Sequence, residues 1–260
     1  MARRLPEDEV QQMWNDLPKD WYSIYNWERV TGDAYAEEIA SFVLSDFGDI
    51  RLEEGGLLQS GFRVDGHCGK GEITTDISQV TEKRLVQGIF NLHQIAHLGE
   101  VLDYEVPLKA GQGASHGDID LLCWRDSDLL IVEAKKPNSN ESILKPILQA
   151  FVYSSLVSTV RNVFLREYSL PPTTTLVPAI LTYRDALSGR QLAKINEYPS
   201  LIELVKKLNQ RLSESEISPF WFYCVQNKSF ELNGCLRISD ENAIVFQDDI
   251  ELTIEPCSVC

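Results

Sequence analysis

The stretch from His116 to Lys135 contains four charged residues that could bind a metal ion and act on a phosphate: Asp118, Asp120, Glu133 and Lys135. Carboxylate ligands with few nitrogen or sulfur partners suit Mg²⁺ or Mn²⁺. Such an ion polarises a scissile phosphate and lowers the pKa of a water, while a lysine orients that water or balances charge on the phosphorus. These residue types therefore predict metal-dependent phosphoryl-transfer chemistry.

The same stretch has the pattern of a β-hairpin. A two-residue turn at Asp126 and Ser127 places Asp120 opposite Glu133 and Asp118 opposite Lys135. Because side chains alternate along a strand, these four charged residues share one face, and Val132 and Ala134 point to the other. Opposed carboxylates repel each other unless a cation or a proton lies between them. For Asp118, a salt bridge with Lys135 is the alternative to metal ligation.

The surrounding sequence predicts the elements that position this face. A helix is expected over about residues 77–97, with Asp76 and Gln79 as its capping pair. Strands are expected at 101–108, 119–124, 129–134 and 175–183, and the continuous apolar run 129–132 indicates a central, doubly covered strand. A second helix ends near Val160, with Pro146 either in its first turn or at a kink.

Asp120 followed by Glu133-Ala134-Lys135, within this order of elements, resembles the PD-(D/E)XK nuclease superfamily over about residues 78–185. Ile119 stands where the motif has its proline. The resemblance implies an α/β fold with a restriction-endonuclease-like core, that is, an α-β-β-β-α-β order with a mixed central sheet flanked by helices. It also implies that Asp120, Glu133 and the Ala134 carbonyl bind Mg²⁺, for which Mn²⁺ can substitute, and that Lys135 is the catalytic lysine.

Two further residues match weaker features of the family. Members often carry a glutamate on the first helix, and helical steps of 100° put Glu82 in line with Leu85, Val86, Ile89 and His93. Many also carry a glutamine four residues before a tyrosine on the second helix, as Gln149 and Tyr153 do here. The alternatives are a solvent-reaching acid for Glu82 and a helix-surface amide for Gln149.

The net charge of −15 is unfavourable for a nucleic-acid partner, because phosphate binding is largely electrostatic. The charge is uneven, however. Residues 1–75 contain 7 Lys+Arg and 15 Asp+Glu, residues 76–190 contain 11 and 13, and residues 191–260 contain 6 and 11. The middle segment is thus nearly neutral, and the acidic flanks predict weak non-specific DNA affinity.

We expect three segments within one compact body: an N-terminal accessory α/β segment at 1–75, the nuclease core at 76–190, and a C-terminal extension at 191–260. The first contains a helix near Tyr35–Leu44 and strand-like pieces around Ile50–Val64. The last contains a helix over 191–213 and short strands over 219–254. Cys224, Cys235, Cys257 and Cys260 could form a zinc site, although their spacing is irregular.

No apolar run approaches the roughly 20 residues needed to cross a bilayer, and no secretory signal follows the first residues. We therefore expect a cytoplasmic protein with reduced thiols and no membrane partner. The leading hypothesis is an Mg²⁺-dependent endonuclease acting on DNA, with RNA as the alternative substrate, in restriction, defence or mobile-element biology. The sequence also allows a homodimer. The alternative is a catalytically inactive interaction or inhibitory module of the same fold, and a third hypothesis is an active nuclease autoinhibited by its acidic flanks.

Overall fold

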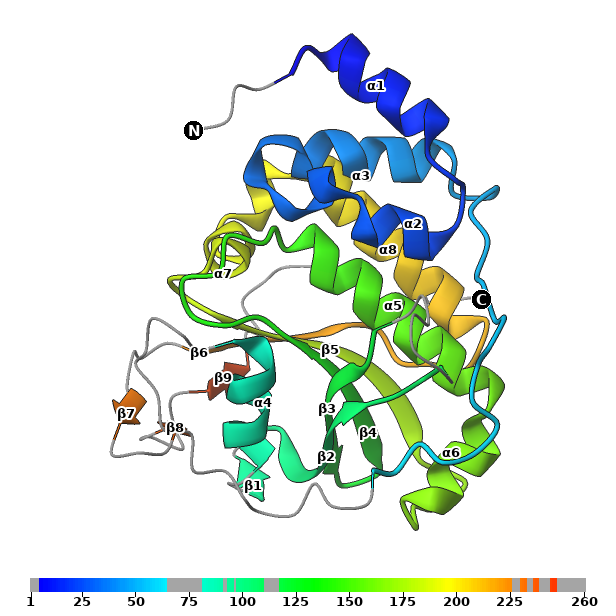
Figure 1. Cartoon of the computed structure of the whole chain (residues 1–260), viewed down its shortest axis with the longest axis vertical. Coiled ribbons are helices and arrows are strands. Elements are labelled where there is room, and N and C mark those ends of the chain that lie inside the picture. The colour runs from blue at the N-terminus through cyan, green and yellow to red at the C-terminus, as the bar shows by residue number, and fades with distance from the viewer. Residues whose placement is uncertain are drawn as a thin grey trace, which may run out of the picture.

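The computed structural model describes residues 5–64, 81–90, 93–95, 97–109, 117–225, 230–232, 236–238 and 244–246. A mixed sheet forms its centre, with strand order β1-β2-β3-β4-β5-β6-β9 (Figure 1). The strands are β1 (Gln94–Ile95), β2 (Gly99–Val106), β3 (Ile119–Arg125), β4 (Asp128–Ala134), β5 (Thr175–Tyr183), β6 (Trp221–Val225) and β9 (Ile244–Phe246). A separate pair contains β7 (Phe230–Leu232) and β8 (Leu236–Ile238).

The pairing between neighbouring strands changes twice across the sheet. β1, β2, β3 and β4 are successively antiparallel, whereas β4, β5 and β6 run parallel, and β9 is antiparallel to β6. β4 and β5 lie in the middle and are buried along nearly their whole length. Their continuous apolar composition is what a strand covered on both faces requires. The expected α/β class with a mixed sheet flanked by helices is confirmed.

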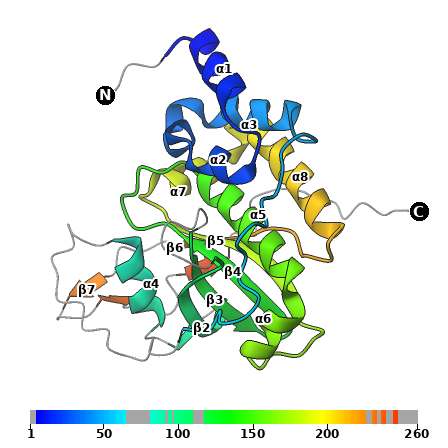
Figure 2. The ribbon, with the colours of Figure 1, turned by 45° about the vertical axis from the view of Figure 1, so that its right-hand side comes forward.

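Helices cover the two faces of the sheet unequally. α4 (Glu82–Phe90) packs on β2 and β3 on one face, and α5 (Leu144–Thr159) packs on β4 and β5 on the other. A further helical layer lies over α5 (Figure 2) and contains α2 (Trp21–Asn26), α3 (Ala36–Ser45) and α8 (Pro199–Ser213). α1 (Glu7–Asp16) lies outside this layer, beyond α3. α5 is therefore buried almost all round, which explains its weak amphipathicity and its many apolar residues.

Shorter helices complete the chain. Turns of 3₁₀ helix at Glu28–Thr31 and Asp33–Tyr35 connect α2 to α3, and one at Ile195–Glu197 precedes α8. α6 (Arg161–Glu167) follows α5, and α7 (Leu187–Leu192) follows β5. Of the helix expected over 191–213, only the part from Pro199 onward is α8, because the end of α7 and a 3₁₀ turn come before it. The described strands after residue 219 agree with the prediction. Pro146 lies in the first turn of α5, where its missing N–H costs no helical hydrogen bond.

Two expectations were wrong. The helix expected to reach residue 97 ends at Phe90, because His93 adopts a left-handed φ of 60° and Gln94–Ile95 forms a hairpin with β2. Its expected capping pair, Asp76 and Gln79, lies outside the described residues. The segment 50–64 has no strand; it contains only isolated bridges at Arg51 and Leu57. An irregular path there follows from its glycine-rich turns, two of which have positive φ.

Candidate active site at the ends of β3 and β4

The β3–β4 hairpin has the predicted register. Leu121 pairs with Val132 and Arg125 pairs with Asp128, around a two-residue turn in which Asp126 has a left-handed φ of 58°. Aspartate tolerates this conformation better than most residues do. Asp120 and Glu133 are the next positions beyond the last pair, and a backbone contact fixes their approach, because Asp120 Oδ2 accepts the Ala134 N–H at 2.7 Å.

The faces of this hairpin also agree with the prediction. Leu122 and Ile131 belong to the core on the α5 side, whereas Val132 and Ala134 belong to the core on the α4 side. Alternation along the strand therefore directs Asp120 and Glu133 toward α5. Glu133 is 3% exposed, and Asp120 is partly exposed near the start of its strand.

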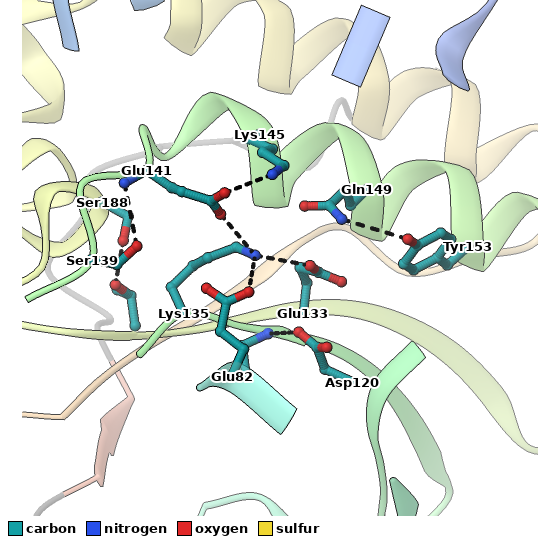
Figure 3. A network of polar contacts seen from close by, with 12 residues as sticks. Glu82, Asp120, Glu133, Lys135, Ser139, Glu141, Lys145, Gln149, Tyr153 and Ser188 are labelled. Carbon is teal, nitrogen blue, oxygen red and sulfur yellow. Dashed lines mark hydrogen bonds and ion pairs between the residues drawn. The ribbon is translucent and has the colours of Figure 1, made fainter. Parts of the chain in front are cut away.

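The Lys135 side chain, 2% exposed, lies among three carboxylates (Figure 3). Its Nζ is 3.1 Å from Glu133 Oε1, 3.4 Å from Glu82 Oε2 and 3.1 Å from Glu141 Oε2. An ammonium has three N–H donors, so three carboxylates can surround it. Lys135 comes directly after β4, and its ammonium is thus reached both from α4, through Glu82, and from the β4–α5 connection, through Glu141.

Glu141 extends this arrangement to a second lysine. Its Oε1 accepts from Lys145 Nζ at 2.6 Å. We call Glu82, Glu133, Lys135, Glu141 and Lys145 the Lys135 network. Glu141 was not predicted from the sequence, although its spacing of four residues from Lys145 on the entry to a helix is a typical signal for an ion pair.

Glu82 lies where its helical phase predicted. Leu85, Val86 and Ile89 are fully buried, and Glu82, one turn earlier, reaches Lys135 while its side chain stays 32% exposed. The predicted fourth member of the stripe, His93, is exposed and outside the helix. The stripe thus begins at the site and ends at Ile89.

Gln149 and Tyr153 lie on the face of α5 above the carboxylates. Gln149 Nε2 donates to the Tyr153 hydroxyl at 3.5 Å, and Gln149 Oε1 is a buried atom without a hydrogen-bond partner among the described residues. Tyr153 is buried against the start of β3, where a Cβ on Gly117 would lie 2.7 Å from its hydroxyl. Glycine is therefore required beside Asp118 for the tyrosine to reach this position.

Tyr25 of α2 is a second residue that the sequence did not suggest. Its ring makes a T-shaped contact with Tyr153, with centroids 6.3 Å apart. Burial raises the pKa of Tyr25, and the Glu133 charge contributes to the same rise. The helical layer therefore reaches the edge of the site, which no short-range pattern could indicate.

The two central carboxylates resist ionisation. Burial, followed by the neighbouring charge of Glu133, raises the pKa of Asp120 well above its usual range. Burial raises the pKa of Glu133 to about 7, although Lys135 opposes this rise. The surrounding carboxylates raise the pKa of Lys135 despite its burial, so the lysine remains charged. The network with Asp120 contains four carboxylates and two ammonium groups, an excess of two negative charges when all are ionised.

This donor set fits a small divalent cation. Glu133 Oε2 is buried without a hydrogen-bond partner among the described residues, and Asp120 and Glu133 belong to opposed strand positions. Mg²⁺ commonly takes one or two carboxylates and fills its remaining positions with water and substrate phosphate. The part of the chain that the structure describes has no cluster of three or more His, Cys, Asp or Glu side chains arranged around a metal position. The ligand set that the family resemblance implies, Asp120, Glu133 and the Ala134 carbonyl, contains only two such side chains.

The remaining candidates are Asp118 and the four cysteines. Asp118 is exposed before β3 and contributes to the raised pKa of Lys83. Cys224, one of the four cysteines considered for zinc, is buried in β6, and the other three lie outside the described residues.

No protein-family model matches this chain, and neither a curated protein nor a solved structure matches it. Among the described helices, none has the length and apolar character needed to cross a bilayer.

Proposed function

We propose that this chain is a Mg²⁺-dependent nuclease that hydrolyses the phosphodiester bonds of nucleic acid as a DNA endonuclease. One observation carries the proposal: Asp120 and Glu133 lie at opposed positions of adjacent strands beside the buried ammonium of Lys135, and one Glu133 oxygen is buried without a hydrogen-bond partner among the described residues. Their mutual repulsion and raised pKa values favour a bound cation, which would restore both to the ionised state.

Each residue of the site would have a role that follows from its functional group. A bound Mg²⁺ supplies positive charge at the scissile phosphate and lowers the pKa of an attacking water. Asp120 and Glu133 would hold the ion, with the Ala134 carbonyl as third ligand. The Lys135 ammonium would donate to a phosphate oxygen or orient the water, and Gln149 could position either through its unpartnered amide oxygen or its NH₂ group.

The order of elements supports the same family expectation. α4, β2, β3, β4, α5 and β5 reproduce the order helix, three strands, helix, strand, with β1 and α6 as additions. The candidate carboxylates stand on the second and third of these strands, as the resemblance to PD-(D/E)XK nucleases implies. A restriction-endonuclease-like core is therefore the finer fold that we propose.

Cleavage of supercoiled plasmid with Mg²⁺ or Mn²⁺ tests the proposal. We expect nicked and linear products from the wild type and at least about 10³-fold slower cleavage by Glu133→Ala and Lys135→Ala, because each removes charge stabilisation at the reacting phosphate. RNA of matched length is assayed in parallel. Equal cutting by all three proteins would exclude this site as the origin of the activity.

A second candidate function is favoured by the pairing of Lys135 itself. Its ammonium already compensates Glu133, Glu82 and Glu141, so the network is partly neutralised without a metal. An inactive interaction module of the same fold, whose acidic flanks bind a basic partner, would retain such a network. Calorimetric titration with Mn²⁺ separates the candidates, because a folded protein that takes up no Mn²⁺ supports the inactive module.

A further inference from the structure

Glu141 occupies a position between two lysines that the nuclease pattern does not assign. One of its carboxylate oxygens is 3.1 Å from Lys135 Nζ and the other is 2.6 Å from Lys145 Nζ. The Lys135 side chain is 2% exposed, whereas that of Glu141 is 25% exposed. Glu141 therefore lies between solvent and the buried ammonium, which contacts the buried Glu133 as well.

The backbone that carries Glu141 is fixed by distant parts of the chain. The Glu141 N–H donates to Ser139 Oγ at 3.2 Å. The next two residues are held from outside the connection: the Ser142 N–H donates to the Thr31 carbonyl at 2.6 Å, and the Ile143 N–H donates to Gln191 Oε1 at 2.7 Å. The N-terminal layer and α7 thus hold the segment on which Glu141 stands.

We propose that Glu141 is a positioning residue that fixes the ammonium of Lys135 at the end of β4, and that Lys145 in turn orients Glu141. The proposal rests on the proposed function in assigning Lys135 to the reaction. Lysine has a long flexible stem, and its ammonium position is set by what it contacts. Without Glu141, the ammonium keeps the contact with Glu133 at 3.1 Å and the longer one with the partly exposed Glu82 at 3.4 Å, whereas Glu141 adds a second contact at 3.1 Å from the β4–α5 connection.

A labelling experiment tests the positioning without needing any activity. The folded protein is acetylated with a limiting amine-reactive ester, and the modification of Lys135 is followed by peptide mass spectrometry. We expect Lys135 to react at least several-fold faster in Glu141→Gln than in the wild type. The substitution removes a carboxylate that shields the amine from the reagent and favours its protonated, unreactive form. Glu214→Gln is the matched control, since it removes the carboxylate of an exposed ion pair with Arg211 on α8.

Cleavage kinetics then connect the position to the reaction. We expect Glu141→Gln to lower kcat roughly 10- to 100-fold with KM within about twofold of the wild type, because a small misplacement of a reacting group is costly while substrate contacts persist. Glu141→Asp keeps the charge and should recover part of kcat. Thermal unfolding of both variants should stay close to that of the wild type.

Unchanged Lys135 labelling in Glu141→Gln overturns the proposal, whatever the cleavage rate. So does a loss of kcat that Glu141→Asp does not recover at all. If Glu141→Gln does not fold, Lys145→Met takes its place, because it removes the other partner of Glu141, and unchanged labelling of Lys135 there counts against the proposal equally. A wild type that cuts no nucleic acid refutes the proposed function alone, since labelling still decides the role of Glu141.

Discussion

Two carboxylates of this protein are equally buried but differ in their hydrogen-bond partners and in the charges around them. Asp103 on β2 and Glu133 on β4 are each 3% exposed. Asp103 has neutral donors on both oxygens: Oδ2 accepts the Tyr168 hydroxyl and Oδ1 accepts the Tyr104 N–H, each at 2.9 Å. Buried polar groups usually reach this state of satisfaction.

Glu133 is buried to the same degree with a different set of neighbours. Only one of its oxygens has a hydrogen-bond partner among the described residues, and that partner is the charged Lys135. Further carboxylates surround it, and its pKa is raised to about 7. Burial alone therefore does not distinguish the two carboxylates. The unpartnered oxygen and the like-charged neighbours of Glu133 are what make it the candidate for a functional role.

The largest effect should be the loss of stability when Glu133 is deprived of Lys135, compared with the loss of an exposed ion pair. Lys135→Met leaves Glu133 and Glu141 without their shared cation, and we expect it to lower the free energy of unfolding by about 3–5 kcal/mol. Lys206→Met, which removes an exposed pair with Glu203, should cost less than about 1 kcal/mol. Urea unfolding of both variants measures this difference.

The loss in Lys135→Met should depend on pH with a defined sign. Glu133 has a pKa raised above its unfolded value, so its contribution to stability is most favourable below about 4.5 and declines as pH rises through about 7. Lys135 lowers the pKa of Glu133, so removing Lys135 raises that pKa further and makes the loss of stability with rising pH larger. The variant should therefore lose more stability at pH 8 than at pH 5. An equal loss at both values would show that packing, and not charge, dominates.

A smaller effect should come from adding metal. If Mn²⁺ binds the folded protein at Asp120 and Glu133, a concentration 100-fold above Kd stabilises it by about 2.7 kcal/mol. Thermal unfolding with and without Mn²⁺ should show this for the wild type and for Asp103→Asn. Glu133→Gln should respond little. Equal stabilisation of Glu133→Gln would place the ion elsewhere.

The smallest effect should come from the contact of Asp103 with Tyr168. Tyr168→Phe leaves a buried carboxylate oxygen with one donor fewer, which costs about 1–2 kcal/mol in the free energy of unfolding. The cleavage rate should not change, because neither residue belongs to the Lys135 network. A fall in kcat without loss of stability would break the distinction between the two carboxylates.

Short-range patterns were sufficient for the hairpin and for most elements. The alternation of β3 and β4, with a turn at Asp126 and Ser127, gave the observed register, and the boundaries of β5 agree with the prediction. The apolar stripe of α4 placed Glu82 correctly but extended too far. Ile89 and His93 fit a helical spacing, yet the pairing of Gln94–Ile95 with β2 outweighed it. Helical propensity yields to sheet pairing when the two compete for the same backbone hydrogen bonds.

The sequence by itself determined that Asp120 and Glu133 stand opposite each other, because strand period and turn length are local properties of the chain. Only the tertiary structure decided how Lys135 is held. The backbone after Glu141 donates to the Thr31 carbonyl and to the Gln191 side chain. Tyr25 reaches Tyr153 across 128 positions of the sequence. Such contacts follow from the packing of whole layers, which no spacing between neighbouring residues specifies.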